Sequence, residues 1–120
     1  MAKTILMVED SPTELKHMIA VLSSKGYVIV TAADGDEALA KAASAQPDVV
    51  LLDVILPKTN GFQVCRQLKH SPATKNIKVL LVTSKTQDSD RFWGMKQGAD
   101  GYLTKPYRAD ELTNMVEQYL

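Results

Sequence analysis

The sequence lacks the features that mark membrane-spanning or disulfide-bonded proteins. Its 120 residues include one cysteine, Cys65, which excludes an internal disulfide and fits a reducing compartment. No apolar run approaches the roughly 20 residues that span a bilayer. The short run after Lys3 is too brief for a signal peptide. We therefore expect a cytoplasmic protein with no membrane insertion.

The charge balance gives no sign of a polyanionic partner. Lys and Arg total 14, and Asp and Glu also total 14, so we expect no nucleic acid partner. The hydrophobic fraction of 45% and the charged fraction of 23% are ordinary for a globular protein. The length suits one domain over residues 1–120, without linker or repeat, and we expect no output domain.

Three runs of four apolar residues each end in polar residues. These runs, with the residues that follow them, are 5–8 with Glu9 and Asp10, 49–52 with Asp53, and 79–82 with Thr83 and Ser84. Unbroken apolar runs of this length are typical of strands buried on both faces of a parallel sheet. Because ligands bind beyond the carboxyl ends of such strands, this edge is the expected functional site.

Strand-like and helix-like segments alternate along the whole chain. The predicted strands are 5–8, 27–31, 49–52, 78–82 and 101–104. The first four predicted helices begin near residues 12, 34, 62 and 88, and the last follows Lys105-Pro106. Five βα units favour a doubly wound α/β fold with the flavodoxin-like strand order 2-1-3-4-5. At the first helix, Ser11 and Glu14 have the spacing of a capping box. Asp88, Ser89 or Asp90 is the expected cap of the fourth helix.

In this strand order the first and third strands are neighbours, so Glu9 and Asp10 would lie beside Asp53. Carboxylates this close repel one another, and Mg²⁺, which prefers oxygen ligands, resolves the conflict. A carboxylate left as nucleophile makes the site similar to an aspartyl-phosphate system. Lys105, just after the last strand, would place an ammonium on the phosphoryl oxygens, and Thr83 would donate a hydroxyl hydrogen bond.

The motifs of the chain match a known family in order and spacing. They are Glu9-Asp10, Asp53 followed by Pro57 and Asn60-Gly61, Thr83-Ser84, and residues 98–106. Together they resemble the receiver domain of bacterial response regulators (CheY-like) over essentially the whole chain. The resemblance implies a single-domain response regulator of a two-component phosphorelay. Such a protein catalyses its own phosphorylation and dephosphorylation but is a signalling protein rather than an enzyme.

The resemblance also implies a role for each matched residue. Asp53 would be the phosphoacceptor. Asp10 would bind Mg²⁺ directly, Glu9 would do so through water, and the backbone carbonyl of Ile55 would be a further ligand. Asp53 itself would complete the metal site.

On the phosphoryl side, the resemblance implies that Thr83 and Lys105 bind the transferred group and that the Lys105–Pro106 peptide is cis. Thr83 and Tyr102 would form the switch, the hydroxyl moving toward the phosphoryl group as the ring turns inward. An aromatic residue at position 102 is equally typical of plain strand packing, so both interpretations of Tyr102 stay open.

The implied partners are a sensor histidine kinase as phosphodonor and a downstream protein at the face formed by the fourth helix, fifth strand and fifth helix. Residues 88–94 are similar to stand-alone receivers of type IV pilus systems in twitching or phototactic motility. Two residues after the acceptor stands Ile55, and two after the switch threonine stands Lys85. Because a bulky apolar Ile55 would hinder an attacking water, we predict a long-lived phosphorylated state.

Two other functions suit the same fold. A flavin-binding electron carrier would want a glycine- and hydroxyl-rich loop after the first strand, where residues 9–12 are Glu-Asp-Ser-Pro. A receiver-like scaffold would bind partners without phosphorylation. Among residues outside the motifs, we expect Trp93 to pack beside Phe92 and Met95, although an exposed indole there would make a docking anchor. We expect Cys65 to be an inert filler. We expect His17 and His70 to lie on the surface.

Overall fold

The computed structural model describes residues 2–120. In this part of the chain five strands form one parallel sheet in the order β2-β1-β3-β4-β5. The strands are β1 (Thr4–Val8), β2 (Val28–Ala32), β3 (Val49–Leu52), β4 (Lys78–Thr83) and β5 (Gly101–Thr104). The helices are α1 (Pro12–Leu22), α2 (Gly35–Ala45), α3 (Gly61–His70), α4 (Asp88–Lys96) and α5 (Ala109–Tyr119), and the 3₁₀ turn η1 (Ser23–Lys25) follows α1. The predicted fold and strand order are confirmed.

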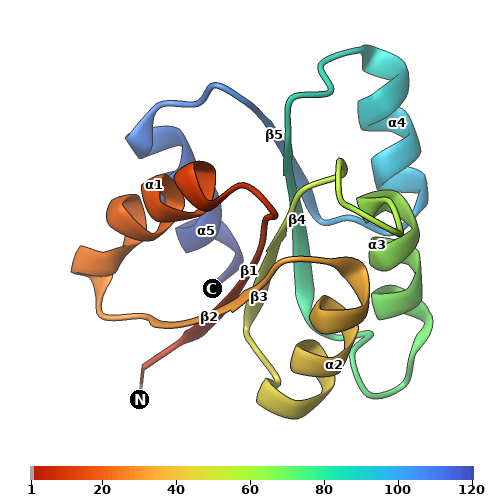
Figure 1. Ribbon diagram of the computed structural model, residues 1–120, viewed down its shortest axis with the longest axis horizontal. Helices are drawn as coiled ribbons and strands as arrows, with labels where there is room; N and C mark the ends of the chain where they lie inside the picture. The colour runs from red at the N-terminus through yellow and green to blue at the C-terminus, as the bar shows by residue number, and fades with distance from the viewer. Residues whose placement is uncertain (1) are drawn as a thin grey trace.

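The helices cover both faces of the sheet (Figure 1). Helices α1 and α5 lie on one face, and α2, α3 and α4 lie on the other. This arrangement follows from the right-handed crossovers that connect parallel strands. The chain first adds β2 on one side of β1 and then adds β3, β4 and β5 on the other side, so the crossover helices fall on opposite faces of the sheet. The carboxyl ends of all five strands therefore meet at one edge, where the loops to the helices begin.

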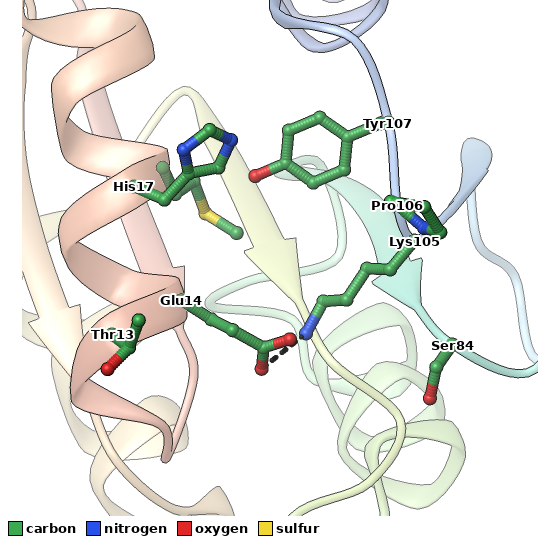
Figure 2. Close-up of a pocket in the computed structure, with 8 residues that line it drawn as sticks. Thr13, Glu14, His17, Ser84, Lys105, Pro106 and Tyr107 are labelled. Atoms are coloured by element: carbon green, nitrogen blue, oxygen red, sulfur yellow. Dashed lines mark hydrogen bonds and ion pairs between the residues drawn. The ribbon is translucent and has the colours of Figure 1, made fainter.

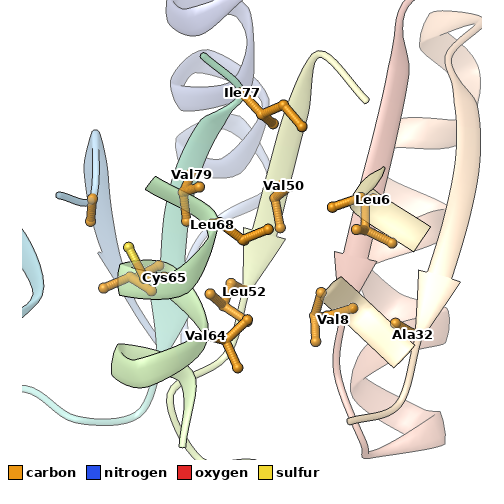
Figure 3. Close-up of a cluster of buried hydrophobic side chains, with 14 of the residues drawn as sticks. Leu6, Val8, Ala32, Val50, Leu52, Val64, Cys65, Leu68, Ile77 and Val79 are labelled. Atoms are coloured by element: carbon orange, nitrogen blue, oxygen red, sulfur yellow. The ribbon is translucent and has the colours of Figure 1, made fainter. Parts of the chain in front are cut away.

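The apolar runs are buried because both faces of the sheet are covered. Every side chain of β3 is fully buried, as are residues 5–8 of β1. Alternate residues point into two separate cores. Figure 3 shows the core under α2 and α3, where Leu6 and Val50 face Leu68. The second core lies under α1 and α5 and includes Met7, Leu51 and Val116 (these three are buried).

The cap of α1 matches the prediction at Ser11 and differs at Glu14. The Ser11 side chain accepts a hydrogen bond from the Glu14 backbone N–H, at 3.3 Å, which is one half of a capping box. The reciprocal contact is not the one predicted, because the Ser11 backbone N–H donates to the Glu9 carboxylate at 3.1 Å. The Glu14 carboxylate turns toward Lys105 instead. Local spacing therefore predicted the cap correctly but gave Glu14 the wrong partner.

Helix α4 begins at Asp88, and its N-cap is Gln87, one residue before the earliest of the predicted caps. Asp90 contributes from within the helix, because its carboxylate accepts a hydrogen bond from the Gln87 backbone N–H at 3.3 Å. The expected packing of Trp93 is also wrong: Trp93 is 52% exposed, and its neighbours Phe92 and Met95 are exposed as well. The cause is Gly94, the buried residue of α4, where an added Cβ would lie 2.7 Å from Leu81.

The remaining expectations for single residues hold. Cys65 is buried, and burial raises the pKa of its thiol to about 12, so the thiolate that reacts or binds metal is scarce at neutral pH. His17 and His70 are exposed. Within residues 2–120, no helix has the length and apolar character needed to cross a bilayer.

Candidate functional site

Three carboxylates meet at the carboxyl edge of the sheet. Glu9 and Asp10 directly follow β1 and Asp53 directly follows β3, and these two strands are hydrogen-bonded neighbours. One carboxylate oxygen from each residue lies within 4.8 Å of the other two. Glu9 is 2% exposed and Asp53 is 6% exposed, whereas Asp10 is open to solvent. The predicted convergence of these residues is therefore present in the structure.

Lys105 is the cation that faces this cluster. It follows β5, and its backbone N–H donates to the Thr83 carbonyl at 2.8 Å, which fixes the start of its side chain at the same edge. Its ammonium donates to Glu9 Oε1 at 2.6 Å and to Asp53 Oδ2 at 2.9 Å. The Lys105–Pro106 peptide is cis, as expected from the resemblance.

The ammonium of Lys105 makes a third contact that the sequence did not predict. It donates to Glu14 Oε2 at 3.0 Å, from the first turn of α1 (Figure 2). A lysine ammonium has three N–H groups, so these three carboxylates occupy all of them. The sequence separation of 91 residues explains why no local pattern indicated the contact.

Burial and mutual repulsion change the protonation of the site. Burial raises the pKa of Glu9 to about 7, and repulsion from Asp53 adds to the rise, although hydrogen bonds from Lys105 and the Ser11 N–H oppose it. Burial also lowers the pKa of Lys105, but its hydrogen bonds to Glu9, Asp53 and Glu14 outweigh burial and raise that pKa overall. Lys105 therefore stays charged at neutral pH, whereas Glu9 is poised between two protonation states.

Asp53 is held by its own loop, and the start of α3 packs closely against its backbone. Asp53 Oδ1 accepts a hydrogen bond from the Ile55 backbone N–H at 3.0 Å. The Gly61 N–H donates to the Val54 carbonyl at 2.7 Å. A Cβ at Gly61 would lie 2.1 Å from the Asp53 carbonyl oxygen, so glycine is required for this approach. The Ile55 side chain is exposed, at the surface of the same loop.

Thr83 and Tyr102 lie on the neighbouring strands β4 and β5. Thr83 is fully buried at the end of β4, and its hydroxyl oxygen accepts a hydrogen bond from the Lys85 N–H at 3.4 Å. The Tyr102 ring is buried, and its hydroxyl donates to the Lys85 carbonyl at 2.8 Å. Arg91 of α4 covers the ring, with its guanidinium carbon 5.0 Å from the ring centroid. The ring is therefore buried against Arg91, and its hydroxyl is tied to the loop after β4.

A cavity of about 520 Å³ opens beside the lysine (Figure 2). It lies between α1 and the loop from β5 to α5, and Glu14 and Lys105 stand at its edge. His17 and Tyr107 line its far side, with their ring centroids 5.6 Å apart. The cavity therefore adjoins the carboxylate cluster through Glu14 and Lys105, and Glu9, Asp10 and Asp53 do not line it.

Comparison with known proteins agrees with this geometry. The family model of the response regulator receiver domain matches residues 5–117. The chain belongs to the response regulator receiver family. It is a response regulator of a two-component phosphorelay, and it is 42% identical to the protein PilH of Pseudomonas aeruginosa over 116 residues. That match covers 97% of this chain and 96% of PilH.

Solved receiver structures share the fold over nearly the full length. The chemotaxis response regulator CheY4 of Vibrio cholerae has a TM-score of 0.92 at 32% identity, covering 100% of both chains. The receiver domain of the sensor histidine kinase PA1611 of P. aeruginosa has a TM-score of 0.91 at 28% identity, covering 99% of this chain and 98% of the other. That structure holds a magnesium ion coordinated in its active site cleft. Some curated relatives are longer, and the chain spans 49% of one and 23% of another.

Proposed function

We propose that Asp53 accepts a phosphoryl group from a phosphohistidine on a sensor histidine kinase. The observation that carries this proposal is the position of Asp53. It is nearly buried, it lies within 4.8 Å of two other carboxylates, and it accepts a hydrogen bond from Lys105 at 2.9 Å. An anionic nucleophile beside a fixed cation suits the transfer of a charged phosphoryl group.

In the proposed transfer, a carboxylate oxygen of Asp53 forms a bond to phosphorus as the bond from phosphorus to the donor imidazole nitrogen breaks. The nitrogen keeps the electron pair of that bond, and the imidazole leaves neutral after taking a proton from solvent. Lys105 stays charged and donates to a phosphoryl oxygen, and Thr83 donates its hydroxyl hydrogen to another. The Ile55 N–H continues to hold the acceptor carboxylate in place.

The residues at the edge of the sheet fit a magnesium ion. One carboxylate oxygen from each of Glu9, Asp10 and Asp53 lies within 4.8 Å of the other two, so a single ion could contact all three. Mg²⁺ prefers carboxylate oxygens together with water as ligands. Asp10 and Asp53 would hold the ion directly, Glu9 would hold it through water, and the Ile55 carbonyl would be a further ligand. Bound there, the ion would neutralise charge on the transferring group.

The test is intact mass spectrometry after incubation with acetyl phosphate and Mg²⁺. We expect one phosphoryl adduct on the wild-type protein and none on the Asp53→Asn variant, because asparagine keeps the shape of the side chain without its nucleophilic charge. Asp48→Asn, at the opposite end of β3, is the control and should be phosphorylated like the wild type. An adduct that persists on Asp53→Asn contradicts the assignment, and no adduct on the wild type favours a phosphorylation-independent scaffold.

Magnesium affinity should depend on pH because the Glu9 pKa lies near 7. A proton on Glu9 competes with the cation, so we expect the apparent affinity for Mg²⁺ to weaken by roughly three- to tenfold between pH 7.5 and pH 6. Calorimetric titration of the wild type at the two values measures the change. Glu9→Gln removes the competing proton and should bind Mg²⁺ weakly at both values. Equal wild-type affinity at both values would contradict the prediction.

The phosphorylated state should be long-lived because the exposed Ile55 side chain stands where water reaches the acceptor loop. We expect Ile55→Asn to lose its phosphoryl group about three- to tenfold faster than the wild type, equivalent to roughly 1 kcal/mol of barrier. Decay of the adduct mass after removal of the donor measures the rate. Val28→Asn changes a similarly exposed apolar residue at the opposite edge of the sheet and should decay at the wild-type rate.

The state of Asp53 would be transmitted through Thr83 and Tyr102 to the face of α4, β5 and α5. Support for this route is the hydrogen bond from the Tyr102 hydroxyl to the Lys85 carbonyl, in the loop that directly follows Thr83 and Ser84. A downstream protein would bind at that face. The similarity to PilH supports the narrower assignment to pilus motility that residues 88–94 predicted.

A further inference from the structure

Glu14 is a carboxylate outside the motifs of the family resemblance, and it binds the lysine that the proposed transfer uses. The three N–H groups of Lys105 are taken by Glu9, Asp53 and Glu14 at 2.6, 2.9 and 3.0 Å. An ammonium with three occupied N–H groups has none left for a phosphoryl oxygen. One of these three contacts must therefore break before Lys105 binds the transferred group.

The three contacts differ in how firmly they are held. The Glu9 side chain is 1% exposed, and its second oxygen accepts from the Ser11 N–H. Asp53 is the acceptor, and its second oxygen accepts from the Ile55 N–H. The Glu14 side chain is 48% exposed and reaches the lysine from the solvent side. Bulk water can replace Lys105 around the half-exposed Glu14 carboxylate at little cost, whereas the nearly buried Glu9 carboxylate would lose most of its solvation without Lys105.

We propose that Glu14 is a positioning residue that occupies one N–H group of Lys105 in the resting protein and releases it when a phosphoryl group arrives. The proposal rests on the proposed function and adds a step to it. Glu14 takes no part in the bond exchange at phosphorus. It slows phosphorylation by competing with the phosphoryl oxygen for the lysine.

Two substitutions of Glu14 separate occupancy of the lysine from simple charge repulsion. Glu14→Gln removes the charge and leaves a weaker acceptor. Glu14→Asp keeps the charge but is shorter by one methylene group, so its oxygens withdraw from Lys105. If occupancy of the lysine is what limits the rate, both variants are phosphorylated faster than the wild type. We expect the phosphorylation rate to rise about two- to fivefold, which corresponds to the free energy of an exposed ion pair.

Glu117→Gln is the matched control. Glu117 has a side chain exposed to a similar degree, 51%, and it also pairs with a lysine, Lys25, at 3.6 Å. Lys25 is the last residue of η1, which lies between the end of α1 and the start of β2, whereas Glu14 lies in the first turn of α1. The control changes the net charge in the same way as Glu14→Gln and should leave the rate unchanged.

The experiment measures the phosphorylation rate with acetyl phosphate and Mg²⁺ at low and high salt. We expect the advantage of both Glu14 variants to shrink at high salt, which screens an exposed ion pair, and melting temperatures to stay near that of the wild type. A purely structural role for Glu14 would not produce this salt dependence. Wild-type rates in both variants overturn the proposal, and so does a faster Glu14→Gln beside an unchanged Glu14→Asp, which indicates repulsion of the donor.

Titration with beryllofluoride, which mimics a phosphoryl group bound to a carboxylate, tests the lysine contact without transfer of a phosphoryl group. Binding should be tighter to Glu14→Gln and Glu14→Asp than to the wild type, by the same two- to fivefold. If the wild type gains no phosphoryl adduct, the proposed function fails, and this titration then decides the role of Glu14 by itself. Equal binding by all three proteins, or binding by none, overturns the proposal.

Discussion

Replacing Gly61 with alanine is expected to lower the free energy of unfolding by about 3 kcal/mol or more. An added Cβ would lie 2.1 Å from the Asp53 carbonyl oxygen and 2.6 Å from the Val54 Cα, and both are backbone atoms. A flexible side chain could move away at low cost, but this backbone is tied to β1, because the Asp53 N–H donates to the Val8 carbonyl at 3.1 Å. Thermal and urea unfolding measure the loss.

The same substitution should also weaken the site, because the segment that must move carries the acceptor. We expect Gly61→Ala to bind Mg²⁺ more weakly and to be phosphorylated more slowly, even where it is still folded. Gly35→Ala, whose Cβ would meet the Val64 side chain at 2.8 Å, should lose less stability. Gly26→Ala meets no atom within 4 Å and carries only the strain of its positive φ of 76°, about 1 kcal/mol. Equal losses in all three variants would contradict the steric explanation.

Replacing Lys105 with methionine is expected to destabilise the magnesium-free protein by about 2–4 kcal/mol at pH 7.5. Methionine keeps much of the apolar stem but leaves the nearly buried carboxylates of Glu9 and Asp53 without their ammonium partner. We also expect the phosphorylation rate to fall by roughly a hundredfold, because a preorganised cation at the transferring group is lost. Lys105→Arg, which keeps the charge in another geometry, should recover stability more fully than rate.

The loss of stability in Lys105→Met should depend on pH and magnesium. In the wild type the Glu9 pKa in the folded state is already above its ordinary value, and removing Lys105 raises it further. A carboxyl with a raised pKa destabilises the folded state fully above that pKa, and the penalty is relieved as the pH falls toward the unfolded value of about 4.5. Added Mg²⁺ should restore stability at pH 7.5. A deficit that ignores both pH and Mg²⁺ would contradict this account.

The fold was predictable because its strands are buried on both faces. Four consecutive apolar residues, as in β3, suit a strand covered by helices on each side, and the observed β3 is fully buried. The meeting of Glu9, Asp10 and Asp53 followed from the same topology, since β1 and β3 flank the point where the strand order reverses. The order of the strands was therefore enough to predict that these three side chains lie together.

The features that the sequence did not predict depend on contacts distant in the chain or on the packing of one residue. Glu14 has the local spacing of a capping box, but Lys105, across the loop from β5, is a stronger partner for its charge than a backbone N–H. In α4, Phe92 and Trp93 are adjacent in sequence and were expected to pack together. The helix instead faces the sheet through Gly94, so both aromatic side chains lie on its outer side.

The packing of α4 on the sheet through Gly94 affects how easily this helix can move. Of the described residues of α4, Gly94 alone is buried. In α3 four residues are buried, and three of them, Val64, Cys65 and Leu68, have apolar side chains. A helix anchored by so little apolar surface has a shallow energy minimum for sliding or tilting over the sheet. Of the two helices, α4 is therefore the one that a small movement of the neighbouring loop displaces more easily.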